Sequence, residues 1–395
     1  MSGSVQTCRS GNRLRASRVL AVSALAAFSL LVTALPSQSA AGDGSVLAWG
    51  SNASGQLGDG GNVSHLTAAP VLNLGNVLEV AGGRDFAFAL KTDLTVSSWG
   101  VNDSGQLGNG TFTNSSLPVA VSGLTEIVEV AAGHYHSLAA NAAGNVFAWG
   151  RNNNGQLGDG TTTRRSKPVR VGATTLPAVT MLAGGRDHSL ALTNTGAVWA
   201  WGSNAYGQIG DGTATRRLTP VPVAGLTDVV AITAGREHSL AVKSDGTVWA
   251  WGSNVYGQLG DGTKTNRSRP VQITSLSGVA DVKAGAHHSL ALRLDGTVAA
   301  WGRNYRGEVG DGSTVTTRPT PKTVAGISGA ISIGTGRDHC LVVLSDHTMR
   351  SWGYNVGGQL GDNSTATRRT PVTVSGVTGA LEAEGGGDHS IAMLG

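Results

Sequence analysis

The segment SDGTVWAWGSNVYGQLGDG, residues Ser244–Gly262, contains the two features that decide the fold. Its first half is a turn sequence, Ser-Asp-Gly-Thr, followed by a short run of β-branched, aromatic and small residues that ends in Trp251-Gly252. Its second half contains the glycine-rich block Gly-Gln-Leu-Gly-Asp-Gly. The segment therefore predicts a β-strand that leads directly into a tight loop.

This unit repeats along the chain. A period near 50 residues is typical of β-propellers rather than of helical solenoids, and almost nothing in the sequence has the pattern of a helix. Seven copies predict an all-β, seven-bladed β-propeller that occupies residues 42–395 as a single domain. The Trp-Gly pair recurs every 50 to 52 residues, at Trp49, Trp99, Trp149, Trp201, Trp251, Trp301 and Trp352.

Each repeat is expected to supply four strands to one meandering blade. Around Trp251, three of these strands are predicted at Val229–Gly235, His238–Val242 and Thr247–Gly252. The fourth is a short Pro-Val strand of the kind found near Pro220–Val223.

The repeats are out of phase with the chain. The first predicted strand is a Trp-Gly strand at Ser45–Gly50, and the last is a His-Ser strand at His389–Leu394. We therefore expect the N-terminal strands to complete the last blade. This pairing closes the ring and removes the exposed sheet edges of an open array.

The first 41 residues differ in composition from the repeats. Four arginines between positions 9 and 18 precede an uncharged apolar run from Val19 to Leu35, and small residues follow at 39–41. This is the pattern of a secretory signal with cleavage after Ala41. A membrane anchor needs about 20 apolar residues, and this run is shorter and contains three hydroxyl residues. We predict export, with no membrane span after cleavage.

Charge and cysteine content restrict the partners and the source of stability. The chain has 29 basic and 25 acidic residues, but four of the basic residues lie in the first 41, so the expected mature protein is near neutral. Nucleic-acid binding needs a basic surface and is therefore not predicted. Cleavage also removes Cys8 and leaves only Cys340, so no intramolecular disulfide can form. Stability must come from packing and backbone pairing.

Two motifs together resemble a known repeat family. Gly-x-Val-x-Ala-Trp-Gly-x-Asn-x-x-Gly-Gln-Leu-Gly-Asp-Gly-Thr and Ala-Gly-x-x-His-Ser-Leu-Ala-Leu are similar to the repeat of the regulator of chromosome condensation family, over residues 44–395. The resemblance implies a seven-bladed propeller closed by strands from both termini, in a secreted member of bacterial type. Family members include exchange factors for a small GTPase, a plant ultraviolet-B photoreceptor and a secreted bacterial inhibitor of β-lactamase. Their shared property is protein recognition through one face of the ring.

Two repeated residue types are interpreted as structural. The tryptophans of the Trp-Gly pairs are expected to pack between neighbouring blades. The histidine of Gly-x-x-His-Ser occurs in six equal copies, whereas a catalytic site needs one dissimilar constellation, and Phe86 replaces it in the first copy. The adjacent serine points to the opposite side of its strand, so a Ser–His pair within one motif is geometrically poor. We predict no enzyme activity. The six histidines are His136, His188, His238, His288, His339 and His389.

The sequence offers only two weak leads for a metal site and none for a cofactor site. His134 and His136 lie on one side of a predicted strand, and His287 and His288 are adjacent, but no cysteine or carboxylate ligands stand at a convincing spacing. The glycine-rich block occurs seven times without a following helix, which disfavours a phosphate cradle. We predict neither a metal nor a cofactor.

The dipeptide before the repeat histidine is where the copies diverge. In a meander this turn and the long glycine-rich loop lie on the same face, with the dipeptide nearer the axis. The resemblance implies that partners contact this dipeptide and that an acidic second residue is important for nucleotide exchange. The alternative is that these charges simply pair with their neighbours. The predicted ring is Arg84, Asp85, His134, Tyr135, Arg186, Asp187, Arg236, Glu237, His287, Arg337, Asp338 and Asp388.

The long loops add aromatic and basic residues outside that ring. Tyr206, Tyr256, Tyr305 and Tyr354 come from four consecutive repeats, and Arg-Arg pairs stand at 164–165, 216–217 and 368–369. Because Tyr and Arg dominate interface hot spots, we hypothesise that these tyrosines, Tyr135 and the loop arginines form one polarised binding face. Burial of Tyr206, Tyr256 and Tyr305 between blades would reject this hypothesis.

Three classes of function compete. We predict a secreted, monomeric, non-catalytic scaffold that binds an unidentified protein. In one version of this prediction, binding inhibits that protein. An exchange-factor-like regulator of a small GTPase is the alternative if the export signal is false. Against it, no repeat exceeds its neighbours by more than two residues, which leaves no room for the inserted wedge that the family's exchange factor uses against its GTPase. A photoreceptor role is not predicted, because the family's light-sensing tryptophans lie in the variable dipeptide, where this chain has no tryptophan. A carbohydrate-binding propeller is a further alternative, but no repeated exposed Trp is left over to stack on a sugar.

Overall fold

The computed structural model describes residues 44–172 and 176–395. The expected signal segment 1–41 lies outside these residues, so the structure does not test it. Within the described ranges, no helix is long and apolar enough to span a membrane.

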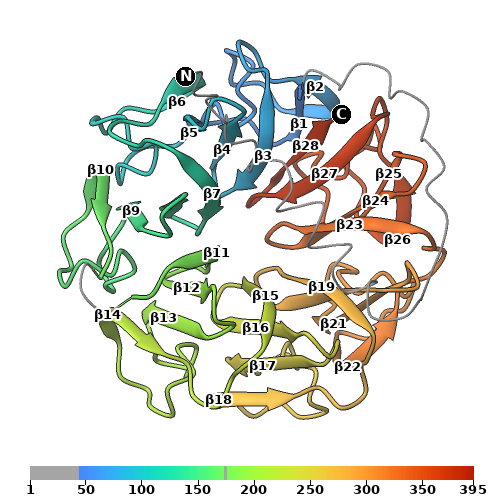
Figure 1. The fold of residues 1–395 in the computed structure, drawn as a ribbon. Helices are drawn as coiled ribbons and strands as arrows, with labels where there is room; N and C mark the ends of the chain where they lie inside the picture. The colour runs from blue at the N-terminus through green and yellow to red at the C-terminus, as the bar shows by residue number, and fades with distance from the viewer. Residues whose placement is uncertain (1–43, 173–175) are drawn as a thin grey trace, which may run out of the picture. The chain divides into compact units, whose positions relative to one another are not determined.

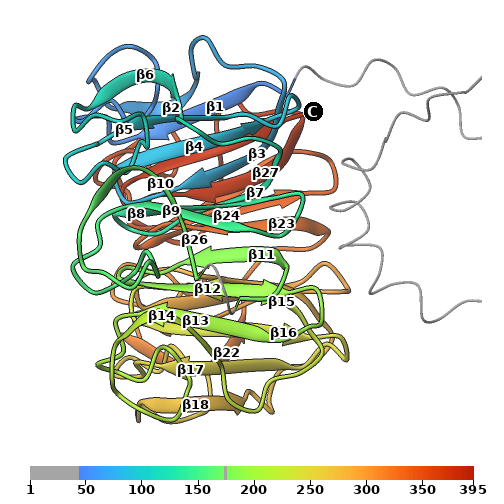
Figure 2. The same cartoon turned by 60° about the vertical axis from the view of Figure 1, so that its left-hand side comes forward.

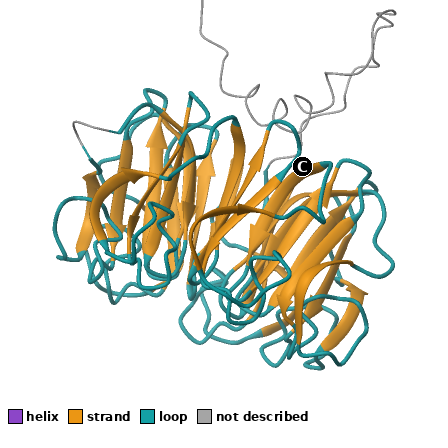
Figure 3. Ribbon diagram, turned by 90° about the horizontal axis from the view of Figure 1, so that it is seen from below, coloured by secondary structure: helices purple, strands orange, loops and turns teal. Residues whose placement is uncertain are grey.

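The described residues form 28 strands in seven four-stranded antiparallel sheets, arranged as blades around an axis (Figure 1). The strands run through the thickness of the ring, so the connections gather on its two faces (Figure 3). Contacts between successive inner strands, such as β11 with β15 and β27 with β3, place those strands around the axis. The expected seven-bladed, all-β propeller is confirmed.

The strands of each blade are named from the axis outward. Blade 1 is β3 (Val77–Gly82), β4 (Phe86–Lys91), β5 (Val96–Gly100) and β6 (Ser115–Ala120). Blade 2 is β7 (Ile127–Ala132), β8 (His136–Asn141), β9 (Val146–Gly150) and β10 (Arg165–Arg170). Blade 3 is β11 (Val179–Gly184), β12 (His188–Thr193), β13 (Val198–Gly202) and β14 (Arg217–Pro222). Blade 4 is β15 (Val229–Ala234), β16 (His238–Lys243), β17 (Val248–Gly252) and β18 (Arg267–Gln272). Blade 5 is β19 (Val279–Ala284), β20 (His288–Arg293), β21 (Val298–Arg303) and β22 (Thr317–Thr323). Blade 6 is β23 (Ala330–Thr335), β24 (His339–Leu344), β25 (Met349–Gly353) and β26 (Arg368–Thr373). Blade 7 is β27 (Ala380–Gly385), β28 (His389–Leu394), β1 (Val46–Gly50) and β2 (His65–Pro70).

The ring closes through blade 7, as expected from the phase of the repeats. Strand β1 pairs with β28 in continuous antiparallel register, from Val46 opposite Met393 to Gly50 opposite His389. Figure 1 shows this junction, where the blue N-terminal strands lie beside the red C-terminal ones. Hydrogen bonds and side-chain packing therefore hold the ring shut in place of a covalent link.

The expected strands of the repeat around Trp251 correspond to β15, β16 and β17 within one residue at each end. The strand near Pro220–Val223 is β14, the outer strand of blade 3, and it begins three residues earlier, at Arg217. The equivalent strand of blade 4 is β18. Its Pro-Val pair is Pro270-Val271.

The Trp-Gly indoles lie in the interfaces between blades. All seven have an exposed fraction of 0%. Each Nε1–H donates to the main-chain carbonyl of the Gln or Glu in the preceding repeat's glycine-rich block, at 2.8 to 3.0 Å. Gly260 shows why that block needs glycine: its φ is +73°, and an added Cβ would stand 2.7 Å from Nε1 of Trp301.

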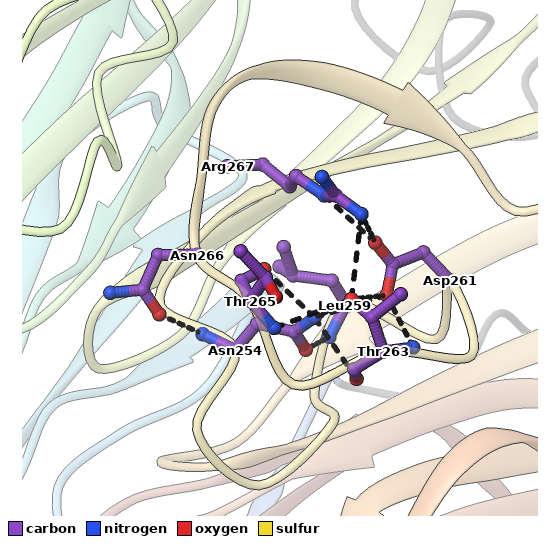
Figure 4. Close-up of polar contacts among 7 residues, drawn as sticks. All are labelled: Asn254, Leu259, Asp261, Thr263, Thr265, Asn266 and Arg267. Atoms are coloured by element: carbon purple, nitrogen blue, oxygen red, sulfur yellow. Dashed lines mark hydrogen bonds and ion pairs between the residues drawn. The ribbon is translucent and has the colours of Figure 1, made fainter.

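The long loop is held by its own polar side chains (Figure 4). In blade 4, the amide of Asn254 donates to Asp261 at 3.0 Å, and its Oδ1 accepts from the backbone of Leu259 at 2.9 Å. Arg267 donates to the other Asp261 oxygen at 2.9 Å. In the last repeat Asn363 replaces the final glycine of the block and has a φ of 59°, a left-handed backbone conformation that Asn adopts more readily than most residues other than Gly.

The repeat histidines and serines bond across the blade interfaces, with no such bond inside one motif. His136 Nε2 lies 2.8 Å from Ser189 Oγ of the next blade, and that serine donates to the carbonyl of Gln156. The histidine is therefore the donor to the serine. The same contact joins His188 to Ser239, His238 to Ser289 and His339 to Ser390, and His288 reaches Cys340 Sγ instead.

We call this series of histidine contacts between blades the relay, and it is interrupted at the junction of blades 7 and 1. His389 faces a blade whose equivalent of the serine is Ala87, and among the described residues neither ring nitrogen of His389 has a hydrogen-bond partner. Phe86, at the histidine position of blade 1, is fully buried and packs on Phe88 at 5.3 Å between ring centroids.

Ala87→Ser should repair the relay. The new hydroxyl would accept from His389 and donate to the Gln56 carbonyl, as Ser189 does with the equivalent groups. We expect the free energy of unfolding to rise by about 1 kcal/mol, measured by urea denaturation. The matched control, Ser189→Ala, should lower it by about 1–3 kcal/mol, because His136 Nε2 is left buried without a partner. A lower stability for Ala87→Ser would contradict this account of the junction.

Candidate functional site: the loop face of the ring

The dipeptide turns and the long loops lie on one face, which we call the loop face. In each blade the carbonyl of the second dipeptide residue accepts from the first backbone N–H after the strand ending in Trp-Gly. Two examples are Asp85 with Val101 at 2.8 Å and Glu237 with Ser253 at 2.8 Å. The side view in Figure 2 shows the blades packed one against the next, so all seven turns meet around the axis.

Arginines at the first dipeptide position reach the second position of the next blade. Arg186 donates to Glu237 at 3.1 Å, and Arg337 donates to Asp388 at 3.0 Å, each across 51 residues of sequence. Arg84 bonds to the hydroxyl of Tyr135 with the same offset. We call this circle of dipeptides the inner ring.

The acidic residues of the inner ring are held by neighbouring side chains. Asp187 is 8% exposed, accepts a hydrogen bond from Gln156 at 3.1 Å and forms an ion pair with Arg186 at 3.0 Å. Asp338 pairs with Arg303 and Arg337. Pairing with neighbours, the alternative that the sequence left open, therefore describes these acids.

Two inner-ring acids have raised pKa values. Burial raises the pKa of Asp85, although Arg84 opposes the shift. Burial also raises the pKa of Asp388, with Arg337 and Arg84 opposing it. These carboxylates lie in neighbouring blades, 1 and 7, and each pairs with an inner-ring arginine, Asp85 with Arg84 and Asp388 with Arg337.

The two inner-ring imidazoles have lowered pKa values. Burial lowers the pKa of His134 to about 3, and nearby Arg236, Arg84 and Arg186 lower it further. His287 also has a pKa of about 3, from burial together with Arg303, Arg236 and Arg186. Both imidazoles are neutral at pH 7, so the charge of the inner ring comes from its arginines and acids.

The tyrosines of the long loops lie outside the inner ring. Tyr206 is 41% and Tyr305 is 48% exposed, so neither is buried between blades. Tyr256 is partly buried and packs against Tyr305 and His287, with ring centroids 6.0 and 5.0 Å apart. Tyr354 lies against the guanidinium of Arg306.

Most of the loop arginines form contacts within or between the loops. Arg165 pairs with Asp159, Arg217 with Asp211 and Arg368 with Asp362. Arg369 donates to main-chain carbonyls of the preceding repeat's loop, and Arg164 lies over Phe112. These contacts oppose the expectation that the loop arginines belong to the binding face, because they are committed to fixing loop shape.

Sequence reasoning missed Arg303. It follows the Trp-Gly pair of blade 5, where the other copies have Ser, Val, Tyr or, in blade 2, Arg151, and it pairs with both Glu308 and Asp338. Glu308 stands where the other blocks have Gln, and this coupled departure from the repeat was the available signal.

Neither weak metal lead forms a cluster. The Nε2 atoms of His136 and His288 contact Ser189 and Cys340. Across the described residues, no group of three or more His, Cys, Asp or Glu side chains is placed to hold a metal ion.

A family model for the RCC1-like domain matches residues 16–392. The chain belongs to the RCC1-like domain family. This agrees with the repeat, with the closure of the ring through blade 7 and with the placement of the variable dipeptides on one face.

Two solved structures are similar to this RCC1-like chain at 25% identity or above. Human WBSCR16 is 25% identical with a TM-score of 0.79, covering 89% of this chain and 98% of that one. Prp20p from Saccharomyces cerevisiae, described with its binding to Gsp1p and histones, is 26% identical with a TM-score of 0.80, covering 89% and 91%. Yeast RCC1 (Prp20) bound to Kap60 shares the fold at 23% identity and a TM-score of 0.81, covering 93% and 96%. No curated protein matches the sequence.

Folding stability should fall as the pH is lowered below about 6.5. Burial lowers the pKa of His136, His188, His238 and His339 to about 3 and that of His389 to about 4. The unfolded chain therefore binds more protons between about pH 6.5 and pH 3, and the native state loses up to about 1.4 kcal/mol per pH unit for each histidine.

Urea denaturation at pH 7.5, 5.5 and 4.5 measures this dependence. His136→Phe, which copies the natural Phe86, should reduce the slope by about one proton. An unfolding free energy that stays constant between pH 7.5 and 4.5 would contradict it.

Proposed function

We propose that this protein is an exported, non-catalytic scaffold that binds another protein through the loop face. The single observation that carries the proposal is the uneven distribution of exposed apolar side chains at the loop tips, the two positions just before each glycine-rich block. Loops of blades 3 to 6 expose Tyr206 (41%), Val255 (50%), Tyr305 (48%) and Val356 (60%). We call these four residues, with Tyr256, the aromatic arc.

The loops of the other three blades carry small or polar residues at the equivalent tips. These are Ala53-Ser54, Asp103-Ser104 and Asn153-Asn154. If the loop tips only stabilised the propeller, we would expect similar residues at all seven tips. Farther along the loops of blades 7 and 1, Val63 (75%) and Phe112 (45%) are also exposed, but no Tyr accompanies them. Exposed apolar groups on neighbouring loop tips, with Tyr among them, are typical of protein interaction sites.

Membership of the RCC1-like family supports the same class of function, since Prp20p was described with its binding to Gsp1p and histones. An exchange-factor-like role is less well supported, because Asp187 and Asp338, two of the acids at the second dipeptide position, are tied into ion pairs. A sugar-binding role has little support, because Trp199 and Trp249 are only partly exposed on the sides of their blades.

Replacement of an exposed tyrosine should weaken partner binding. We expect Tyr206→Ala to weaken capture of the partner at least about tenfold, because a hot-spot residue contributes about 2 kcal/mol. The measurement is site-specific photocrosslinking on native cells, with the photoreactive group at position 305.

The matched control places the group at Leu294, which is 52% exposed in the turn between β20 and β21 on the opposite face. A discrete adduct is expected from position 305 and not from 294, and it should disappear in Tyr206→Ala. Adducts of equal yield from both positions would oppose a loop-face site.

Export is a separate proposal, supported by the composition of residues 1–41. The full-length chain should accumulate outside the cytoplasm with Gly42 as its first residue, as measured by fractionation and mass spectrometry of the intact protein. Replacement of two leucines in the apolar run by aspartate should retain it in the cytoplasm. A cytoplasmic protein that keeps residues 1–41 would contradict export and would strengthen the exchange-factor alternative.

A further inference from the structure

The inner ring has one junction at which an arginine meets no oxygen acceptor in the next blade. Arginines 84, 186 and 337 reach Tyr135, Glu237 and Asp388. In blade 4 the same position is Arg236, and the second position of blade 5 is His287. An imidazole stands where the other junctions have a carboxylate or a hydroxyl.

Both residues of this junction have buried nitrogen atoms without a hydrogen-bond partner in the described parts of the chain. These atoms are Nε of Arg236 and Nδ1 of His287, whose residue is only 8% exposed. Arg236 Nε lies 3.6 Å from Glu237 Oε1, beyond hydrogen-bond distance, and that oxygen already accepts from Arg186. Buried donors left unmatched cost free energy. The Arg236 side chain as a whole is 41% exposed, so a ligand can bring an acceptor to its guanidinium.

The surroundings of the junction suit a negatively charged group on a larger molecule. Burial, Arg303, Arg236 and Arg186 all keep His287 neutral by lowering its pKa, and its Nδ1–H tautomer is a hydrogen-bond donor. Tyr256 packs on the His287 ring at 5.0 Å and joins it to Tyr305. The junction therefore lies directly beside the aromatic arc.

We propose that the junction of Arg236 and His287 binds the carboxylate of an aspartate or glutamate side chain on the protein partner. This carboxylate would take the place of the acid missing from blade 5, and the residues beside it would pack on Tyr256 and Tyr305. The inference rests on the proposed function and names the chemistry by which the loop face selects its partner.

The test uses two short peptides, acetyl-Gly-Asp-Gly-amide and acetyl-Gly-Asn-Gly-amide, with acetate as the free carboxylate. NMR of the imidazole carbons in the whole chain should show saturable shifts at His287 with the Asp peptide, at least about tenfold weaker with the Asn peptide. Arg236→Gln should weaken binding about tenfold. The matched control is Arg293→Gln, the same substitution at the far end of β20, where Arg293 donates to Thr297 away from the loop face, and it should leave the affinity unchanged.

His287→Asp provides a second arm that does not depend on loss of folding. The new carboxylate would pair with Arg236, so this variant should melt at a higher temperature than His287→Ala and should no longer bind the Asp peptide. Equal affinity for the Asp and Asn peptides, unchanged binding by Arg236→Gln, or binding of acetate without the Asp peptide would each overturn the proposal.

The two proposals can fail separately. If crosslinking from position 305 succeeds and the peptides show no preference for Asp, the carboxylate assignment is wrong and the loop face stands. If the Asp peptide binds at His287 and no partner crosslinks from position 305, the aromatic arc is wrong and the acid-binding junction stands.

Discussion

The indole of each Trp-Gly pair lies fully buried between two blades and donates its N–H to the loop of the preceding repeat. Most other features of the molecule depend on this contact. It fixes the glycine-rich block against the next blade, and the Asn-Asp-Arg network then fixes the rest of the loop. A tip held in this way can present an exposed Tyr or Val without rearranging, so the aromatic arc lies on a rigid base.

The repeated parts of the fold could be predicted because they repeat. Seven spaced Trp-Gly pairs gave the number of blades, and the phase of the strands gave the closure through blade 7. Both depend on the local pattern or on counting. The structure agrees because similar units meet similar neighbours.

The polar partners were harder to predict because they belong to the interfaces between repeats. A serine beside a histidine in sequence is bonded to the histidine of the preceding blade, 53 residues away for His136 and Ser189. Likewise, Arg186 is adjacent to Asp187 yet also pairs with Glu237. Such offsets follow from blade stacking, which no single motif encodes. The loop arginines could have been assigned from sequence, because an Asp stands six residues before Arg165, Arg217 and Arg368.

The pairing of β1 with β28 has a consequence for how the chain could be rewired. The backbone of Leu394 donates to Ser45 at 2.9 Å, so the two ends of the described propeller are already adjacent. A short linker between residues 395 and 44 would make the ring continuous, and new termini could then be opened in a hairpin turn of any other blade. Such a circular permutant would preserve every strand pairing, because the order of blades around a closed ring has no natural first member.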